Sequence, residues 1–397
     1  MSWEYKRLDE LGTISRGKSK HRPRNDPSLF GGKYPFIQTA DVKNANFYIT
    51  EYTQTYSEKG LAQSRLWEKG TLCITIAANI ADTGILYIDA CFPDSIMGFI
   101  PYKDKSDVRY VKYCFDILQK QCQQISQGAT QDNLSWEKLS TIRFPVPSLE
   151  KQKRIADILF AYDELIENNQ KQIKLLEEAA QRLYKEWFVD LHFPGHETTP
   201  IVDGIPQGWN YSEVKSVVSL LSGYAFKSAD FNEAGKYKIV TIKNVQDGSF
   251  DGEKVNRISE IPSKMPVHCI LKDGEALLSL TGNVGRVCLV NGDDYLLNQR
   301  VAKIYSQFPT YAYCLFRSKD MFDIMNNLAN GAAQQNLSPI RTENAKILIP
   351  NFVIIKQFER IISPMISKIL MLNKSNENLK QARDRLLPKL MSGEIEV

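Results

Sequence analysis

The chain has 397 residues, of which 43% are hydrophobic and 24% are charged, and its formal net charge is +4. This length predicts about two to three globular domains, and the mild positive charge permits a nucleic-acid partner without requiring one. Because the chain has no apolar run of about 18 residues and no signal-peptide core at its start, we expect a cytoplasmic protein without a membrane span.

The predicted elements occur twice in the same order. Apolar, β-branched runs predict strands in the first half, and each has a counterpart in the second half at nearly constant spacing. The paired runs are 34–44 with 237–248, 70–79 with 274–283, and 84–89 with 285–290. The phrase QGATQDNLS at 127–135 then recurs as NGAAQQNLS at 330–338. This order indicates a tandem duplication whose sequence has diverged.

A long heptad pattern follows each copy. Apolar positions alternate in steps of four and three from Ile155 to Trp187 and again from Phe358 to Leu390, which predicts two helices with a seam on one side. Arg383 is a poor seam residue. Pro364 would remove a hydrogen bond inside the second helix, so the helix can alternatively restart at Ser363-Pro364.

The two seams are predicted to pair with each other. Asn169 and Asn376 lie near the middles of their helices, and in an antiparallel pair the middles meet. We therefore expect these two amides to lie together and to fix the helix register. Alternatively, each asparagine faces water.

The predicted fold is α+β, with two mixed α/β domains in tandem, separated by two long antiparallel coiled-coil helices with pseudo-two-fold symmetry. The predicted bounds are 1–148 for the first domain, 149–189 for the first helix, 190–208 for a linker, 209–350 for the second domain, and 351–397 for the second helix and tail.

Residue patterns typical of catalysis are missing. The chain has no P-loop, no N-P-P-[FY] motif of amino-methyltransferases and no C-x-x-C pair. His192 and His196 are separated by Phe-Pro-Gly, which does not place them on one helix face. The seven cysteines are scattered and odd in number, which favours reduced thiols. We therefore expect no catalytic residue, no metal site and no cofactor in this chain, and a binding module rather than an enzyme.

A basic stretch is the first candidate binding surface. Residues 15–24 contain five cations and no acid, the expected footprint of phosphate contacts, although a solvated basic loop fits the same residues. These cations are Arg16, Lys18, Lys20, Arg22 and Arg24. The corresponding loop at 222–231 has aromatic residues and a single cation, Lys227.

Amides in the repeated phrase form the second candidate surface. Side-chain amides suit bidentate reading of adenine edges. The alternative is a capped turn, in which Asn133 or Ser135, and Asn336 or Ser338, begin a short helix. The candidate DNA-reading amides are Gln131, Asn133, Gln334, Gln335 and Asn336.

The ordered set resembles the specificity (S) subunit of type I restriction–modification systems. The resemblance rests on the two phrases with the strands that follow them, on FPVPSLEKQKRIADIL at 144–159 and on LLPKLMSGEIEV at 386–397, and it spans essentially the whole chain. The second copy departs from the pattern, with Ile355-Lys356-Gln357 where the first has an acidic phrase ending at Gln152.

The resemblance implies a non-catalytic subunit whose two target-recognition domains each bind one half of a bipartite, asymmetric site in double-stranded DNA. It implies two methyltransferase (M) partner subunits and restriction (R) subunits, with S-adenosylmethionine, ATP and Mg²⁺ on those partners. Two alternatives stay open: the specificity subunit of a bifunctional enzyme that both methylates and cleaves, and a protein–protein scaffold that does not bind DNA.

Overall fold

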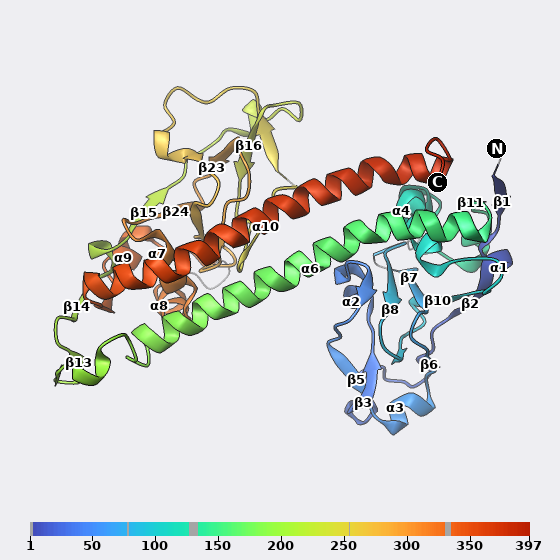
Figure 1. Ribbon diagram of the computed structural model, residues 1–397, viewed down its shortest axis with the longest axis horizontal. Coiled ribbons are helices and arrows are strands. Elements are labelled where there is room, and N and C mark those ends of the chain that lie inside the picture. Colours follow the sequence, from blue (N-terminus) through green and yellow to red (C-terminus); the bar gives the residue numbers. More distant parts are fainter. Residues whose placement is uncertain (1–2, 78, 127–133, 254, 330–334) are drawn as a thin grey trace. The chain divides into compact units, whose positions relative to one another are not determined.

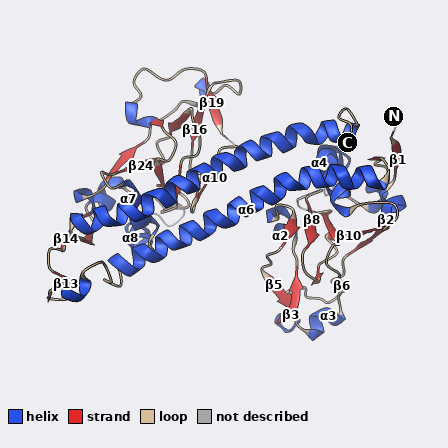
Figure 2. Cartoon of the chain, viewed as in Figure 1, coloured by secondary structure: helices blue, strands red, loops and turns tan. Residues whose placement is uncertain are grey.

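The structure, a computed structural model, describes residues 3–77, 79–126, 134–253, 255–329 and 335–397. The chain divides into two compact units, one formed by Met1–Asn168 with Glu377–Val397 and the other by Asn169–Asn376. Each unit contains both helices and sheets, as predicted (Figure 2). The division falls inside both long helices, so each of these helices contributes residues to both units.

The first unit contains a five-stranded sheet. In spatial order its strands are β2 (Gly12–Arg16), β10 (Ile96–Pro101), β7 (Leu72–Thr75), β8 (Thr83–Leu86) and β4 (Tyr48–Ile49). The first four pair antiparallel, and β4 joins β8 in parallel. Strands β7 and β8 are buried along their whole length, which accounts for the continuous apolar runs in the sequence.

A second sheet of the first unit consists of β5 (Gln54–Tyr56), β3 (Phe30–Phe36), β9 (Ala90–Cys91) and β6 (Leu66–Trp67) in that order. The strands β1 (Glu4–Lys6) and β11 (Phe144–Val146) form a separate antiparallel pair. The strand predicted over 34–44 is correct only at its start, because Thr39–Asn44 forms helix α2. The Asp41 carboxylate accepts a 2.7 Å hydrogen bond from the Gln38 backbone NH, and this capping stabilises a helix start there.

The remaining helices of the first unit are α1 (Leu8–Leu11), η1 (Pro27–Leu29), α3 (Glu58–Ala62), α4 (Val108–Ser126) and α5 (Trp136–Leu139). Helix α4 packs on β8, while β3, β5 and α3 lie at the end of this domain farther from α6 (Figure 1). The main core contains apolar residues of β7, β10 and α4, and it includes Leu390 and Met391 from the C-terminal end of the chain.

The second unit repeats these sheets. One four-stranded sheet consists, in order, of β15 (Ser219–Ser222), β24 (Val301–Tyr305), β21 (Ala276–Ser279) and β22 (Val287–Leu289). The other consists of β19 (Asn256–Ile258), β16 (Tyr237–Val240), β23 (Tyr295–Leu297) and β20 (Ile270–Leu271). Short antiparallel pairs are β14 (Asn210–Glu213) with β25 (Lys346–Ile349), β17 (Val245–Gln246) with β18 (Ser249–Phe250), and β12 (Ile201–Val202) with β13 (Ile205–Pro206).

The order β15-β24-β21-β22 corresponds to β2-β10-β7-β8, and the parallel pair of β16 with β23 corresponds to that of β3 with β9. The pair of β14 with β25 likewise corresponds to that of β1 with β11. The tandem arrangement of two mixed domains predicted from the sequence is therefore confirmed.

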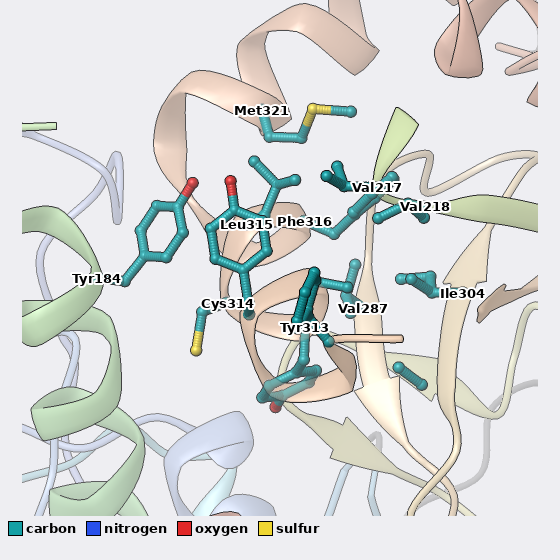
Figure 3. Close-up of a cluster of buried hydrophobic side chains, with 14 of the residues drawn as sticks. Tyr184, Val217, Val218, Val287, Ile304, Tyr313, Cys314, Leu315, Phe316 and Met321 are labelled. Atoms are coloured by element: carbon teal, nitrogen blue, oxygen red, sulfur yellow. The ribbon is translucent and has the colours of Figure 1, made fainter. Parts of the chain in front are cut away.

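The second unit also contains the helices α7 (Pro309–Arg317), α8 (Lys319–Leu328) and α9 (Pro339–Glu343) and the short turns η2 (His196–Thr198), η3 (Val214–Ser216), η4 (Ser228–Asp230) and η5 (Val267–Cys269). Residues 313–316 of α7 pack among Tyr184 of α6, Met321 of α8 and the strands β22 and β24 (Figure 3). This core fixes the second domain on the helices of its own unit.

The two longest elements are α6 (Leu149–Phe188) and α10 (Phe352–Ser392). The restart considered at Ser363-Pro364 does not occur, because α10 continues through both residues. Ser363 and Pro364 are exposed, so water can satisfy the carbonyl that the proline leaves without its helical donor.

The two long helices run antiparallel within each unit. In the second unit, Asn169 contacts Asn376 and Trp187 contacts Phe358, so the residue numbers rise along α6 as they fall along α10. In the first unit, Asp163 of α6 pairs with Arg383 of α10. All predicted seam positions are buried or half-buried, and the poor seam residue Arg383 is accommodated by this ion pair.

Candidate nucleic-acid interface

Three segments of the first domain meet at one end of its five-stranded sheet, where β2 and β7 end and β10 begins. The Lys18 NH donates to the Phe92 carbonyl at 3.1 Å, which joins the basic loop to the turn before β10. The Ile76 NH donates to the Ser95 carbonyl at 3.0 Å, and the Leu134 NH donates to the Ile76 carbonyl at 2.9 Å. We call this place the three-segment edge of the first domain; it comprises residues 17–26, 92–95 and 134–135.

The second domain forms the same edge with equivalent backbone bonds. The Tyr224 NH donates to the Leu297 carbonyl at 2.9 Å, and the Leu280 NH donates to the Arg300 carbonyl at 3.0 Å. The Leu337 NH donates to the Leu280 carbonyl at 2.8 Å. The three-segment edge of the second domain comprises residues 223–231, 298–300 and 335–338. The repeated phrase in the sequence thus marks the same structural position in both domains.

A close backbone approach explains a glycine at each edge. A Cβ atom on Gly17 would lie 2.3 Å from the Phe92 carbonyl oxygen, and one on Gly223 would lie 2.2 Å from the Asn298 carbonyl oxygen. Neither position can carry a side chain without moving backbone. These glycines hold the loop that begins each edge tightly against the turn that follows β9 or β23.

The basic loop of the first domain is held by many internal bonds. The Ser64 hydroxyl donates to the Lys18 carbonyl at 2.8 Å, and the His21 NH donates to the Gln63 side chain at 3.0 Å. Asp26 lies 2.8 Å from His21 Nε2. A hydrogen bond from the Ser28 hydroxyl, followed by one from the Ser28 backbone NH, lowers the pKa of Asp26, so this carboxylate stays charged at neutral pH.

The five predicted cations of this loop are all exposed, but they are not equivalent. Arg22 donates to the carbonyls of Ser19 and His21, and Arg24 pairs with Asp94 at 2.9 Å. Lys18 and Lys20 are exposed beside them. Arg16 ends β2 and lines an open hollow of about 500 Å³ with Trp136. The structure therefore brings Arg16, Lys18 and Lys20 to one edge, with Arg22 and Arg24 partly engaged in fixing the loop.

Arg65 is a basic residue of this region that the sequence analysis did not single out. Its guanidinium lies 3.8 Å from the Trp67 ring centroid, and Nη1 donates to the Ser15 hydroxyl at 3.1 Å. The side chain is exposed and adjoins the strand that ends at Arg16. No motif surrounds Arg65, because its contact with Ser15 depends on the packing of one sheet against the other and not on residues near it in the sequence.

The equivalent loop of the second domain is mainly aromatic. Tyr224 occupies the backbone position of Lys18, and its ring meets Phe226 edge-to-face with centroids 5.1 Å apart. Lys227 is exposed immediately before η4, and Phe231 follows it. The first loop thus offers charge, while the second offers rings and one cation.

The structure describes only some of the candidate amides in the repeated phrase. Gln131, Asn133 and Gln334 lie outside the described residues. Gln335 and Asn336 are exposed, and the Asn336 side-chain oxygen accepts a 2.8 Å hydrogen bond from the Thr281 hydroxyl. The structure thus places the two described amides on the edge of the second domain.

The alternative of a capped turn is confirmed for the serines of the phrase. Ser135 caps α5 and Ser338 caps α9, each accepting a hydrogen bond from the backbone NH three residues later. These caps fix where the described end of each phrase meets the domain.

The predicted register pair lies inside the second unit. The Asn169 side-chain nitrogen donates to the Asn376 side-chain oxygen at 2.9 Å, and both residues are buried. A buried amide pair in an otherwise apolar seam disfavours sliding of one helix along the other, because any shift would leave both amides without a partner.

Each domain is also attached to α6 by a carboxylate, which is buried in the first unit and half-buried in the second. In the first unit, Asp163 accepts a 2.5 Å hydrogen bond from the Tyr113 hydroxyl of α4 and pairs with Arg383. In the second unit, Glu177 accepts a 2.8 Å hydrogen bond from the Tyr313 hydroxyl of α7 and pairs with Arg317. Burial raises the pKa of Glu177, and the charge of Arg317 opposes that rise.

Across the ranges given above, no group of three or more His, Cys, Asp or Glu side chains is placed to hold a metal ion. None of the helices in that part of the chain is long and apolar enough to cross a membrane. All seven cysteines are buried and unpaired, and burial raises the pKa of the Cys288 thiol to about 12.

The two domains share one fold and an equivalent loop edge, and each is joined to the long helices, so the chain is a duplicated two-domain protein. The chain matches the family model of the type I restriction modification DNA specificity domain over residues 1–178 and 206–381. The chain therefore belongs to the family of type I restriction–modification specificity subunits, and the resemblance stated from the sequence is confirmed.

Curated relatives match this chain over its whole length. The type I restriction enzyme MjaIX specificity subunit of Methanocaldococcus jannaschii is 28% identical over 418 residues, covering 100% of this chain and 94% of the relative. The MjaVIII specificity subunit of the same organism is 27% identical and covers 100% and 93%. The crystal structure of the S subunit from M. genitalium has the same fold, with a TM-score of 0.60 and 15% identity over 98% of this chain and 96% of that chain.

Proposed function

We propose that this chain is the DNA sequence-recognition subunit of a type I restriction–modification complex, and that each domain binds one half of a bipartite, asymmetric site in double-stranded DNA. The observation that carries the proposal is the pair of three-segment edges. Their backbone bonds are equivalent, whereas their exposed side chains differ in charge and shape. A duplicated scaffold with different side chains suits the reading of two different short sequences.

The chemistry of the edges agrees with a nucleic-acid ligand. Exposed cations such as Lys18 and Lys20 suit phosphate groups, whose contacts give affinity without sequence preference. Exposed amides such as Gln335 suit adenine edges in the major groove. The three-segment edge of the second domain therefore offers both a cation for phosphate groups, Lys227, and exposed amides for base edges.

The proposal assigns no chemical step to this chain. In the proposed complex, two methyltransferase subunits modify adenine with S-adenosylmethionine, and restriction subunits use ATP and Mg²⁺ to translocate and cleave DNA. The contribution of this chain is to select the site and to recruit those partners. Membership of the specificity-subunit family supports this division of labour.

The long helices are proposed to set the gap between half-sites. The predicted seam from Ile155 to Trp187 would extend about 50 Å at about 1.5 Å per residue. At about 3.4 Å per base pair, that length corresponds to about 15 base pairs of duplex DNA. The buried pair of Asn169 and Asn376 supports a fixed register for this ruler.

Mapping of methylated adenines tests the proposal. The chain is co-expressed with its methyltransferase subunits in a host without other adenine methylation, and the host genome is sequenced for modified bases. We expect one motif split into two short halves by a fixed gap. Exchanging residues 1–148 for the equivalent domain of another family member should change one half of the motif and leave the other half intact. A continuous motif, or methylation without any motif, would contradict the proposal.

A further inference from the structure

The turns that precede β10 and β24 have the same backbone and different side chains. In the second domain, the Val301 NH donates to the Asn298 carbonyl at 2.9 Å, which places Gln299 and Arg300 at the two central positions of a tight turn. In the first domain, the Ile96 NH donates to the Pro93 carbonyl at 3.1 Å. Asp94 and Ser95 take the equivalent central positions there.

Neighbouring backbone groups hold the turn of the second domain on every side. The Asn298 NH donates to the Val240 carbonyl at 3.2 Å, and the Gln299 NH donates to the Tyr224 carbonyl at 3.0 Å. The Arg300 carbonyl accepts from Leu280. The turn is therefore ordered before any ligand arrives, which reduces the entropy that binding has to overcome.

The side chains of this turn are available for a ligand. Gln299 and Arg300 are both exposed. Within the described part of the chain, neither side chain forms a hydrogen bond or an ion pair. The turn also adjoins the aromatic loop at Tyr224 and, through Leu280, the described end of the repeated phrase at Leu337. It thus occupies the middle of the three-segment edge.

The turn of the first domain differs from that of the second in the charge of its side chains. Phosphates are the same in every duplex, so a contact with them does not by itself require different side chains in the two domains. The first domain has Asp94, and its carboxylate already pairs with Arg24 at 2.9 Å. A carboxylate repels phosphate but can accept a hydrogen bond from the amino group of cytosine. Base edges differ between two half-sites, and an exposed arginine beside an exposed glutamine on a preformed turn has the donors and acceptors that suit them.

We propose that the turn of residues 298–301 reads base edges in the half-site bound by the second domain. Arg300 would donate to the O6 and N7 atoms of a guanine, and Gln299 would contact an adenine beside it, the pairings that their donor geometries favour in the major groove. This inference rests on the proposed function and names two specificity-determining residues for it.

The test is a selection from duplexes randomised at both half-sites, using this chain in complex with its methyltransferase subunits. For Arg300→Ala, we expect the preference for guanine at one base pair to fall about 10- to 100-fold. The preferred base at each position of the other half-site should stay unchanged, so that half-site serves as an internal reference. Gln299→Ala should weaken the preference at a neighbouring base pair of the same half-site.

Lys319→Ala is the matched control, because it removes one exposed positive charge from α8 of the same unit. It should leave the selected motif unchanged. If the wild-type complex selects no split motif, the proposed function itself fails. If the wild type selects a split motif and Arg300→Ala keeps all its letters, only the present inference fails. A uniform loss of binding across all sequences would identify Arg300 as a phosphate contact and would also overturn the inference.

Discussion

The two recognition domains have the same edge built from different side chains. In the first domain, Lys18 and Lys20 stand in a loop fixed by Ser64 and Gln63, whereas the second domain places Tyr224 and its neighbouring rings on the same backbone bonds. The bonds that shape each edge are made by the backbone, so the exposed side chains can change without altering the fold. The scaffold and the reading surface are separable.

The contacts that attach each domain to α6 show the same relation in the interior of each unit, where equivalent contacts are made by different residues. Both units use a carboxylate of α6 and a tyrosine hydroxyl of the domain, but the arginine comes from α10 in the first unit and from α7 in the second. Both units thus keep an ion pair and a tyrosine hydrogen bond at α6, although the arginine comes from a different helix in each unit. The following predictions test how far this equivalence extends, beginning with the largest expected effect.

Shortening both long helices should alter the gap between the half-sites. Deletion of 170–176 together with 369–375 removes one heptad from each seam and keeps the pair of Asn169 and Asn376 in register. We expect the gap in the methylated motif to shrink by about 3 base pairs, because seven residues rise about 10 Å. Deletion from α6 alone should abolish methylation through a mismatched seam. An unchanged gap in the paired deletion would refute the role of the helices as a ruler.

Removal of the α6 carboxylate of the second unit should destabilise the protein. Glu177→Ala removes the nearer of the two carboxylates that pair with Arg317 and leaves the Tyr313 hydroxyl without its acceptor, so we expect a loss of about 1–3 kcal/mol in the free energy of unfolding. Chemical denaturation followed by circular dichroism measures it. Glu178→Ala, at the exposed neighbouring position, is the control and should change stability by no more than about 0.5 kcal/mol. A similar, small effect of both variants would contradict the account.

The asparagine pair should show opposite effects in single and double variants. Asn169→Ala leaves the Asn376 amide buried without its partner and should cost about 1–3 kcal/mol. Replacing both asparagines with leucine should be neutral or stabilising, while the gap between half-sites becomes less uniform because the register loses its polar marker. Thermal melting and methylome mapping test the two parts separately. A double-leucine variant with one sharp gap would show that the pair does not set the register.

The smallest effects are expected at the basic loop. Lys18→Ala or Lys20→Ala should weaken DNA binding by a similar factor for all sequences and reduce the salt dependence by about one unit of slope each. Arg24→Ala breaks an exposed ion pair and should change stability by about 0–1 kcal/mol. Fluorescence anisotropy over a salt series measures the slope. A changed motif in Lys18→Ala would mean that this lysine reads a base.

The duplication of the fold could be predicted because both copies carry the same local hydrophobic patterns. The apolar runs that became β7 and β21 and the heptads of α6 and α10 are periodic, and periodicity survives divergence of individual residues. The misassigned segment, Thr39–Asn44, fails for a physical reason. Its helix depends on the capping contact of Asp41, and β-branched residues masked that signal.

The site was less predictable than the fold. The basic loop and the repeated phrase were visible as motifs, but Arg65 and the turn at Gln299 and Arg300 were not. Their position depends on strand pairing between segments far apart in the chain. The sequence also overstated the free charge of the basic loop, because the partners of Arg22 and Arg24 become apparent only once the chain has folded.

The place of Leu390 and Met391 in the core of the first domain has a consequence for how the chain completes its folding. On a ribosome, the amino-terminal domain is synthesised first but lacks these two apolar residues until the chain has been extended past them. A nonsense mutation that removes 377–397 would therefore damage the domain encoded farthest from it. The second unit, Asn169–Asn376, would keep its own core intact.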